Sequence, residues 1–421
     1  MVHLALIFPL FLIIILRKLF SVTFLNPTGV FCGIWILILS LMQLMAPDFY
    51  FTYEAVFYIL SFSLFFFIGE FLFFALNRIK INVIKYHYCY SENFETRLRK
   101  YTILISMISL IGSLFYLKSF VDHFGSLAEF LIAGSLIRED LFDGNISISS
   151  ISIFSMLLSY SAINLAMVYY TKYGFRWFQM MPFVSVLISA FSQAARAGIV
   201  IMIFQIFVGK VFRLLNQKEN NVEYKLLKPL LFIIPILLLI FSFIDSFRHQ
   251  SFEISGDKSN STINSLNVYS FGGVAGFTSY LDDIHKSTND LTYGRYTFSS
   301  LYNILGISKA EAGVYDQYLN VSPSQTANIY SIFRPLLEDF GYLGLIFWAL
   351  MLGVISNFVF RYSLRGSLTS TSLCISLYIY LMFSFIAPLT QFNSFLLSCI
   401  LPPFIIQISK FSFKFKRNIS L

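Results

Sequence analysis

Long apolar segments recur along almost the whole chain, and they constrain its fold more than any other feature. A segment of about 20 apolar residues crosses the roughly 30 Å hydrocarbon core of a bilayer as a helix. Eleven such segments occur, at 2–16, 28–46, 52–76, 101–117, 151–170, 173–191, 194–212, 229–243, 341–360, 369–386 and 395–408. The pattern predicts an all-α polytopic membrane protein of about 11 transmembrane helices, because lipid leaves no other partner for the backbone of such segments.

Composition excludes the main alternatives. Of the 421 residues, 57% are hydrophobic and 12% are charged, whereas soluble domains contain about 25% charged residues. A soluble fold of this size could not bury so much apolar surface, which excludes a soluble enzyme, a disordered scaffold and a secreted disulfide framework. The net charge of +8 reflects basic residues in the loops between the apolar segments, so no nucleic-acid partner is expected.

The distribution of charge predicts the orientation. If the connections between the segments alternate sides, one side collects 21 of the 30 Lys and Arg residues and only four acidic residues. The other side holds the remaining nine basic residues and 16 of the 22 acidic residues. Basic residues concentrate in cytoplasmic loops. The N-terminus is therefore predicted outside and the C-terminus in the cytoplasm.

Two outer connections are too long to be simple turns, and they divide the chain into three regions. Segment 118–150 places Phe120, Phe124, Leu127 and Leu131 at helical spacing, which predicts an amphipathic helix on the outer interface. Region 1–243 then contains the first eight transmembrane helices and this segment. Region 244–340 is a large outer loop between the eighth and ninth helices. Region 341–421 contains the last three helices and a basic cytoplasmic tail.

The outer side carries arginines that could bind an anion. A guanidinium is always charged, and its planar fork matches phosphate oxygens. The candidates are Arg138, Arg196, Arg248, Arg295 and Arg334. Arg196 lies at a tight junction of two apolar segments, where it either snorkels to the surface or binds an anion. Arg248 either pairs with Asp245 or serves the same anion site.

The segment 326–344 carries the most specific pattern in the chain. It contains Asn-Ile-Tyr-Ser, then Arg334, then Glu-Asp-Phe-Gly-x-x-Gly at the start of an apolar segment. This pattern resembles the bacterial oligosaccharide repeat-unit polymerases, the O-antigen polymerases of the Wzy type. The stretch 293–298, the Arg-Ala-Gly at 196–198, the number of apolar segments and the position of the large loop are also similar to that family.

The resemblance implies a definite activity and location. It implies a multi-pass protein of the bacterial inner membrane, with its N-terminus, large loop and active site facing the periplasm. Such glycosyltransferases move a growing glycan from undecaprenyl diphosphate onto the incoming lipid-linked repeat unit. The implied partners are undecaprenyl-diphosphate-linked oligosaccharides, the lipid bilayer and a chain-length regulator protein. Because the sequence has no Asp-x-Asp motif and no Gly-rich phosphate loop, no metal or other cofactor is expected.

The candidate site residues follow from this chemistry. A departing diphosphate needs fixed cations, which the five outer arginines could supply. Candidates for further substrate contacts are Tyr293, Asn328 and Tyr330, with Tyr269, Tyr280 and Tyr296 as additional stacking surfaces. The acceptor hydroxyl should need a general base, and the catalytic candidates are Glu338, Asp339 and His249, with His285, Asp282 and Asp283 further outer choices. Asp339 could instead cap the helix that follows it.

Two other readings of the chain are kept open. A lipid-linked oligosaccharide flippase or other transporter predicts charges at mid-membrane, internal repeats and short loops, which this chain largely lacks. An O-antigen ligase would share the donor and differ in its product. Within the apolar segments Glu70 is the least expected acid, and it is either protonated, paired or functional.

Overall fold

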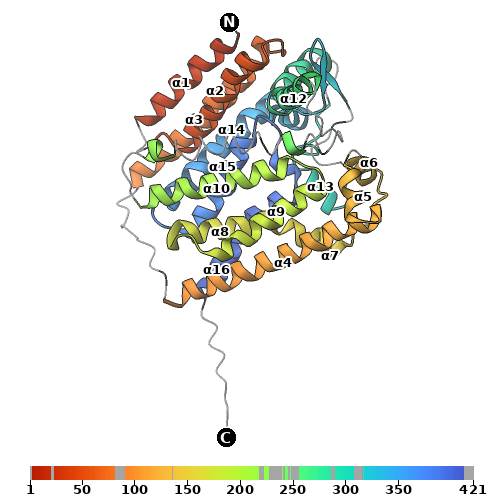
Figure 1. Cartoon of the computed structure of the whole chain (residues 1–421). Helices are drawn as coiled ribbons and strands as arrows, with labels where there is room; N and C mark the ends of the chain where they lie inside the picture. Colours follow the sequence, from red (N-terminus) through yellow and green to blue (C-terminus); the bar gives the residue numbers. More distant parts are fainter. Residues whose placement is uncertain are drawn as a thin grey trace.

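The chain is described here by a computed structural model. It describes residues 2–19, 23–80, 90, 92–134, 136–217, 222–226, 239, 242–244, 247, 256–285, 290–307, 315 and 317–411. Most of these residues are helical (Figure 1). The longer elements are α1 (Val2–Lys18), α2 (Pro27–Met45), α3 (Tyr53–Lys80), α4 (Glu92–Phe124), α8 (Ser159–Tyr173), α9 (Met181–Ser192), α10 (Ala197–Asn216), α12 (Gly256–Tyr280), α14 (Phe333–Leu364), α15 (Leu368–Phe383) and α16 (Asn393–Lys410). The shorter ones are α5 (Leu127–Ile132), α6 (Leu136–Phe142), α7 (Ser150–Leu157), η1 (Trp177–Met180), η2 (Leu281–His285), α13 (Ser299–Ile304), β1 (Leu319–Ser322), β2 (Gln325–Ala327) and η3 (Leu389–Gln391).

The predicted membrane class is confirmed. Six helices in the described part of the chain are long and apolar enough to cross a membrane, and two shorter helices are also apolar. Ten of the eleven predicted segments coincide with helices. The eighth, 229–243, lies largely outside the described residues.

Three details differ from the prediction. Segment 118–150 is not one amphipathic helix: α4 continues to Phe124, Gly125 takes a φ of 92°, and α5 and α6 follow. Ser126 restarts the helix because its hydroxyl accepts the Glu129 N–H at 3.2 Å. The segment at 151–170 is divided into α7 and α8 at Leu158. Finally, the predominantly helical chain contains one small antiparallel hairpin, β1–β2.

Helices α1, α2 and α3 lie side by side, and α14 packs against α3 in the same direction (Figure 1). The two helices approach closely because glycine lies on both sides of the contact. A Cβ on Gly69 would lie 2.2 Å from the Leu350 carbonyl oxygen, and one on Gly353 would lie 2.2 Å from the Phe66 carbonyl oxygen. Small residues of this kind allow helix backbones to meet in a membrane.

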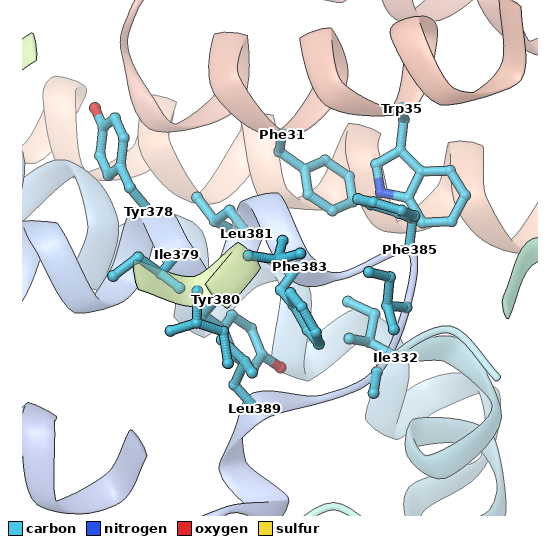
Figure 2. Close-up of a cluster of buried hydrophobic side chains, with 14 of the residues drawn as sticks. Phe31, Trp35, Ile332, Tyr378, Ile379, Tyr380, Leu381, Phe383, Phe385 and Leu389 are labelled. Carbon is cyan, nitrogen blue, oxygen red and sulfur yellow. The ribbon is translucent and has the colours of Figure 1, made fainter. Parts of the chain in front are cut away.

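Helix α15 lies between this group and the remaining helices, which include α4, α8, α9, α10 and α16 (Figure 1). Figure 2 shows the buried cluster where α15 meets α2 and the segment before α14. The Trp35 indole donates to the Ser384 hydroxyl at 3.0 Å, and the Ile332 N–H donates to the Ser384 carbonyl at 2.9 Å. The end of α15 is therefore joined to both α2 and the start of α14.

Buried serines connect α4, α8 and α9. The hydroxyls of Ser109, Ser113, Ser159, Ser185 and Ser189 form a chain of contacts between 2.6 and 2.9 Å. All five residues are buried. Hydroxyls that satisfy one another across helices stabilise packing in lipid, where water is absent.

Helix α12, part of the predicted outer loop, descends into the bundle. Its Asn267 amide donates to the Met45 carbonyl at the end of α2, at 3.2 Å. Three residues before the end of α12, the Phe277 ring lies 5.5 Å from the Phe333 ring, which in turn lies 5.4 Å from the Phe62 ring. Phe62 is nine residues into α3, about 13 Å along that helix. The described part of α12 therefore packs against α2, α3 and the start of α14.

Glu70 is paired. Its Oε2 accepts a hydrogen bond from Arg17 Nε, and its Oε1 accepts the Thr28 N–H at 2.8 Å. Both charged side chains are buried. Of the readings left open by the sequence, the pair with Arg17 is the one observed, and it ties α1 and the start of α2 to α3.

Candidate functional site

The candidate site is built on the first two turns of α14. Residues 333–340 form a helical piece that ends at Gly341, whose φ of 64° and ψ of −172° break the helix before it continues to Leu364. Glycine tolerates a positive φ because it has no Cβ. The break lets the short piece lie at the depth of Phe62 while the rest of α14 packs along α3. Arg334 and Glu338 lie on one face of this piece, four residues apart.

Arg334 is enclosed by three tyrosine rings. Its guanidinium carbon lies 3.8 Å from the ring centre of Tyr315, 4.0 Å from that of Tyr330 and 4.7 Å from that of Tyr280. Its residue exposure is only 2%. Electron-rich ring faces stabilise a desolvated cation by about 2 kcal/mol at such distances, which offsets part of the cost of burying this charge.

Polar partners satisfy most of the guanidinium. Arg334 Nε donates to Glu338 Oε1 at 3.0 Å, and Nη2 donates to Gln317 Oε1 at 2.7 Å. The third nitrogen, Nη1, is buried and has no hydrogen-bond acceptor in the part of the chain that the structure describes. A buried donor without an acceptor costs about 1–3 kcal/mol. The ion pair with Glu338 is therefore formed, and Nη1 remains to donate to a ligand. These six residues (Tyr280, Tyr315, Gln317, Tyr330, Arg334 and Glu338) are called the Arg334 site below.

The tyrosine hydroxyls stay protonated. Burial raises the pKa of Tyr315 well above its ordinary value, and the Glu338 carboxylate raises it further. Burial also raises the pKa of Tyr280 and Tyr330. Tyr315 can therefore donate to Glu338 Oε2, at 3.0 Å, and Tyr330 donates to the Gln317 carbonyl at 2.7 Å.

Asp339 holds a turn against α14. Its Oδ1 accepts the Thr292 hydroxyl and, at 3.1 Å, the Tyr296 N–H, while its Oδ2 accepts the Thr297 N–H. Its own carbonyl accepts the Tyr293 N–H at 3.0 Å. The carboxyl group is fully buried. With three donors from the turn and no exposure, the Asp339 carboxylate suits a positioning role better than proton transfer, whereas the Glu338 side chain keeps 14% exposure.

The turn connects to the Arg334 site through one aromatic stack. The Tyr296 ring lies 5.2 Å from the Tyr315 ring at an angle of 23°. The turn is also held from the other side, since Gln391 Nε2 donates to the Tyr296 carbonyl at 2.9 Å. Its tip is exposed: Tyr293, with a φ of 51° and an exposure of 74%, and Arg295 both face outward.

The structure thus brings together part of the predicted set. Arg334, Glu338 and Tyr330 meet in the Arg334 site. Asp339, Tyr293 and Arg295 belong to the adjoining turn. Asn328 is half-buried, two residues before Tyr330.

The other predicted residues lie elsewhere or outside the described part. Arg196 is buried at the junction of α9 and α10, next to Ala194, which has a φ of 48°. Arg138 belongs to α6, but its side chain is outside the described residues. Arg248 and His249 are also outside them, as is the side chain of His285.

Two members of the site, Tyr315 and Gln317, were not named from the sequence, and Tyr280 was named only as an additional stacking surface. Tyr280 was one of several available tyrosines, with nothing to select it. Tyr315 and Gln317 stand in an irregular stretch with neither helical nor strand periodicity. The only signal in that stretch is its combination of aromatic and amide residues within a long outer segment. Such a combination is common in loops.

No family model, curated protein or solved structure matches the chain. The fold and the site together define a helical membrane protein with a buried arginine–glutamate pair, enclosed by tyrosines, beneath one end of its helix bundle. A site of this kind offers a fixed cation, an acid and aromatic faces in a space of low polarity, which suits an anionic or sugar-bearing ligand.

Proposed function

We propose that the protein polymerises undecaprenyl-diphosphate-linked oligosaccharide repeat units on the periplasmic face of the bacterial inner membrane. The observation that carries the proposal is the burial of Arg334 among three tyrosine rings, with Glu338 one helical turn away. The site lies within the bundle rather than on an external domain. A lipid-linked donor would keep its tail in the membrane and present its diphosphate at such a depth.

The proposed roles follow from the contacts. Arg334 Nη1 donates to a phosphate oxygen of the donor, and Arg295, exposed on the turn, supplies the second cation that a diphosphate requires. Arg334 alone would not suffice, because Glu338 already balances its charge. Tyr293 and Asn328 are available to the sugars at the outer edge of the site. Asp339 keeps the turn, and with it Arg295, in place.

Glu338 is proposed as the general base. The acceptor hydroxyl passes its proton to the Glu338 carboxylate, and its oxygen bonds to the anomeric carbon of the growing glycan. The bond between that carbon and the phosphate oxygen breaks, and undecaprenyl diphosphate leaves with the electron pair. No metal is needed for this sequence, since guanidinium groups stabilise the leaving charge.

The topology is part of the proposal: 11 transmembrane helices, N-terminus in the periplasm and C-terminus in the cytoplasm. The parallel packing of α3 and α14, in which Tyr342 contacts Ser61 and Asn357 contacts Glu70, supports it, because the third and ninth helices should enter from the same side. Reporters fused after Phe243 and after Leu364 test the assignment. The reporter after Phe243 should be located in the periplasm, and the reporter after Leu364 should be located in the cytoplasm. The reverse result would place the Arg334 site on the cytoplasmic face and refute the assignment.

A deletion strain complemented with variants tests the activity. Loss of the gene should leave a single repeat unit on the surface glycan, and Arg334→Ala and Glu338→Gln should reproduce that loss of the length ladder. Lys118→Ala, which removes an exposed charge at the end of α4, is the matched control and should retain the ladder. A normal ladder in both site variants would refute the proposal.

A transporter of lipid-linked oligosaccharides is the second candidate. It is favoured by the presence of two buried ion pairs, Arg17–Glu70 and Arg334–Glu338. The same strain separates the candidates by its product. Complete absence of the repeat unit from the surface indicates a transporter or a ligase, whereas a single remaining repeat indicates a polymerase. A chain-length regulator is proposed as a partner. If the length of the ladder depends on this regulator, the regulator should co-purify with the protein.

A further inference from the structure

Two arginines converge at the opposite end of the bundle, where α1, α3 and α14 meet. Arg17 Nη2 and Arg361 Nε both donate to the Asn357 amide oxygen, at 3.5 and 3.2 Å. Glu70 neutralises only one of them, because its two oxygens are taken by Arg17 and by the Thr28 N–H. Arg361 therefore has a polar contact with this group but forms no direct ion pair with Glu70.

Arg365 adds a second such cation. It follows the last residue of α14 and stands one helical turn beyond Arg361, so the two guanidinium groups lie on the same side of the helix. Both residues are half-buried. Neither forms an ion pair with any residue that the structure describes. Arg361 lies 4.8 Å from the Phe74 ring centre, and Arg365 lies 5.1 Å from that of Tyr362.

The neighbouring surface is apolar. Exposed side chains on α3 and α14 next to these arginines are Phe71, Leu72, Ile355, Phe358 and Leu364. In a helical membrane protein, such a surface contacts acyl chains. The two unneutralised cations therefore lie where a lipid-facing surface ends, at the side that the charge pattern assigns to the cytoplasm.

We propose that Arg361 and Arg365 bind the phosphate of an anionic phospholipid headgroup, with its acyl chains on the adjoining face of α3 and α14. The guanidinium forks match the phosphate oxygens, and basic sites between helices at the cytoplasmic side suit such headgroups. A soluble phosphate offers the same oxygens but nothing for the apolar surface. The lipid is therefore the ligand that uses both features. This site is separate from the Arg334 site and does not depend on the proposed activity.

Purified full-length protein tests the proposal. Its apparent affinity for phosphatidylglycerol is measured in mixed micelles with phosphatidylcholine, together with the shift in unfolding temperature on adding the lipid. Arg361→Gln with Arg365→Gln should weaken the affinity at least about tenfold and abolish the shift, because two charge-assisted contacts are lost. Arg361→Lys with Arg365→Lys keeps the charge without the fork and should give an intermediate affinity.

The control removes one positive charge elsewhere. Lys100→Gln lies on an exposed part of α4, which packs against α7, α8, α9 and α16, and it should bind phosphatidylglycerol as the unmodified protein does. Unchanged affinity in the double glutamine variant would overturn the proposal. An equal loss in Lys100→Gln would overturn it too, because the binding would be non-specific. Inorganic phosphate giving the same temperature shift would show that a free anion, not a lipid, is the ligand.

Discussion

The centre of the Tyr315 ring lies 3.8 Å from the guanidinium carbon of Arg334. The same tyrosine donates its hydroxyl to Glu338 Oε2. One side chain from the irregular stretch before β1 thus contacts both members of the buried ion pair. It also carries the Tyr296 stack, so it connects the ion pair to the turn that presents Arg295.

Two substitutions at Tyr315 should separate its two contacts. Tyr315→Phe keeps the ring but leaves Glu338 with one hydrogen bond fewer, at a cost of about 1.5–3 kcal/mol for a bond to a charged group. Tyr315→Leu also removes the stacking on Arg334, so its loss should be larger. The glycan ladder in a complemented deletion strain and the unfolding temperature of the purified protein measure the two effects. Equal behaviour of the two variants would show that the ring contact is unimportant.

Asp339→Asn should loosen the 292–297 turn. An amide presents one acceptor oxygen in place of the two that now receive three hydrogen bonds, and its NH₂ group would face a backbone N–H. A loss of about 2–4 kcal/mol in the free energy of unfolding is expected. Cleavage within the turn by an added protease should become faster. Asp290→Asn, an exposed acid just before the turn, is the control and should change neither quantity.

The sequence predicts the parts of this molecule that depend on local periodicity. Apolar segments become helices because hydropathy and length are enough to place them. Arg334 and Glu338 were named separately, as an anion-binding arginine and a candidate base in the 326–344 pattern, and their spacing of four residues places both on one helix face. Tyr330 stood in the same short motif. These predictions rest on neighbours within a few residues of one another.

Long-range contacts could not be predicted in this way. Tyr280, at the end of α12, and Tyr315, more than thirty residues further along the chain, both contact Arg334, and no local pattern in the sequence indicates either contact. Asp339 could be recognised only as a cap or a base, since the turn that it holds lies more than forty residues away in the chain. The partner of Glu70 could not be predicted for the same reason, because Arg17 is 53 residues away in the chain.

The contact between α3 and α14 predicts a specific sensitivity to a methyl group. Gly353→Ala would place its Cβ 2.2 Å from the Phe66 carbonyl oxygen, so the two helices must separate, at a cost of about 1–3 kcal/mol for overpacking. Gly33→Ala, in α2, is the control because a Cβ there meets no atom within 4 Å. Thermal unfolding of the purified proteins compares the two. If both variants unfold at the same temperature, the close approach does not contribute to stability.

The three tyrosines around Arg334 predict alkaline destabilisation. Burial raises the pKa of Tyr280, Tyr315 and Tyr330 in the folded protein, whereas the unfolded chain has a value of about 10. The protonated phenol is thus favoured by folding, so its contribution is complete below about pH 10 and is lost as the pH rises above that value. Unfolding temperatures measured from pH 8 to 11 should fall above pH 10. The triple Phe variant should show a shallower fall, and an identical slope would contradict the assignment.

The buried Arg17–Glu70 pair predicts strong coupling between α1 and α3. Removing one partner, as in Arg17→Gln or Glu70→Gln, leaves a charge buried without its counterpart, which typically costs about 3–5 kcal/mol. The double variant Arg17→Gln with Glu70→Gln leaves no such charge, so it should be more stable than either single variant. A double-mutant cycle on the free energy of unfolding measures this coupling. Additive single effects would mean that the two charges do not depend on each other, although the residues are in contact.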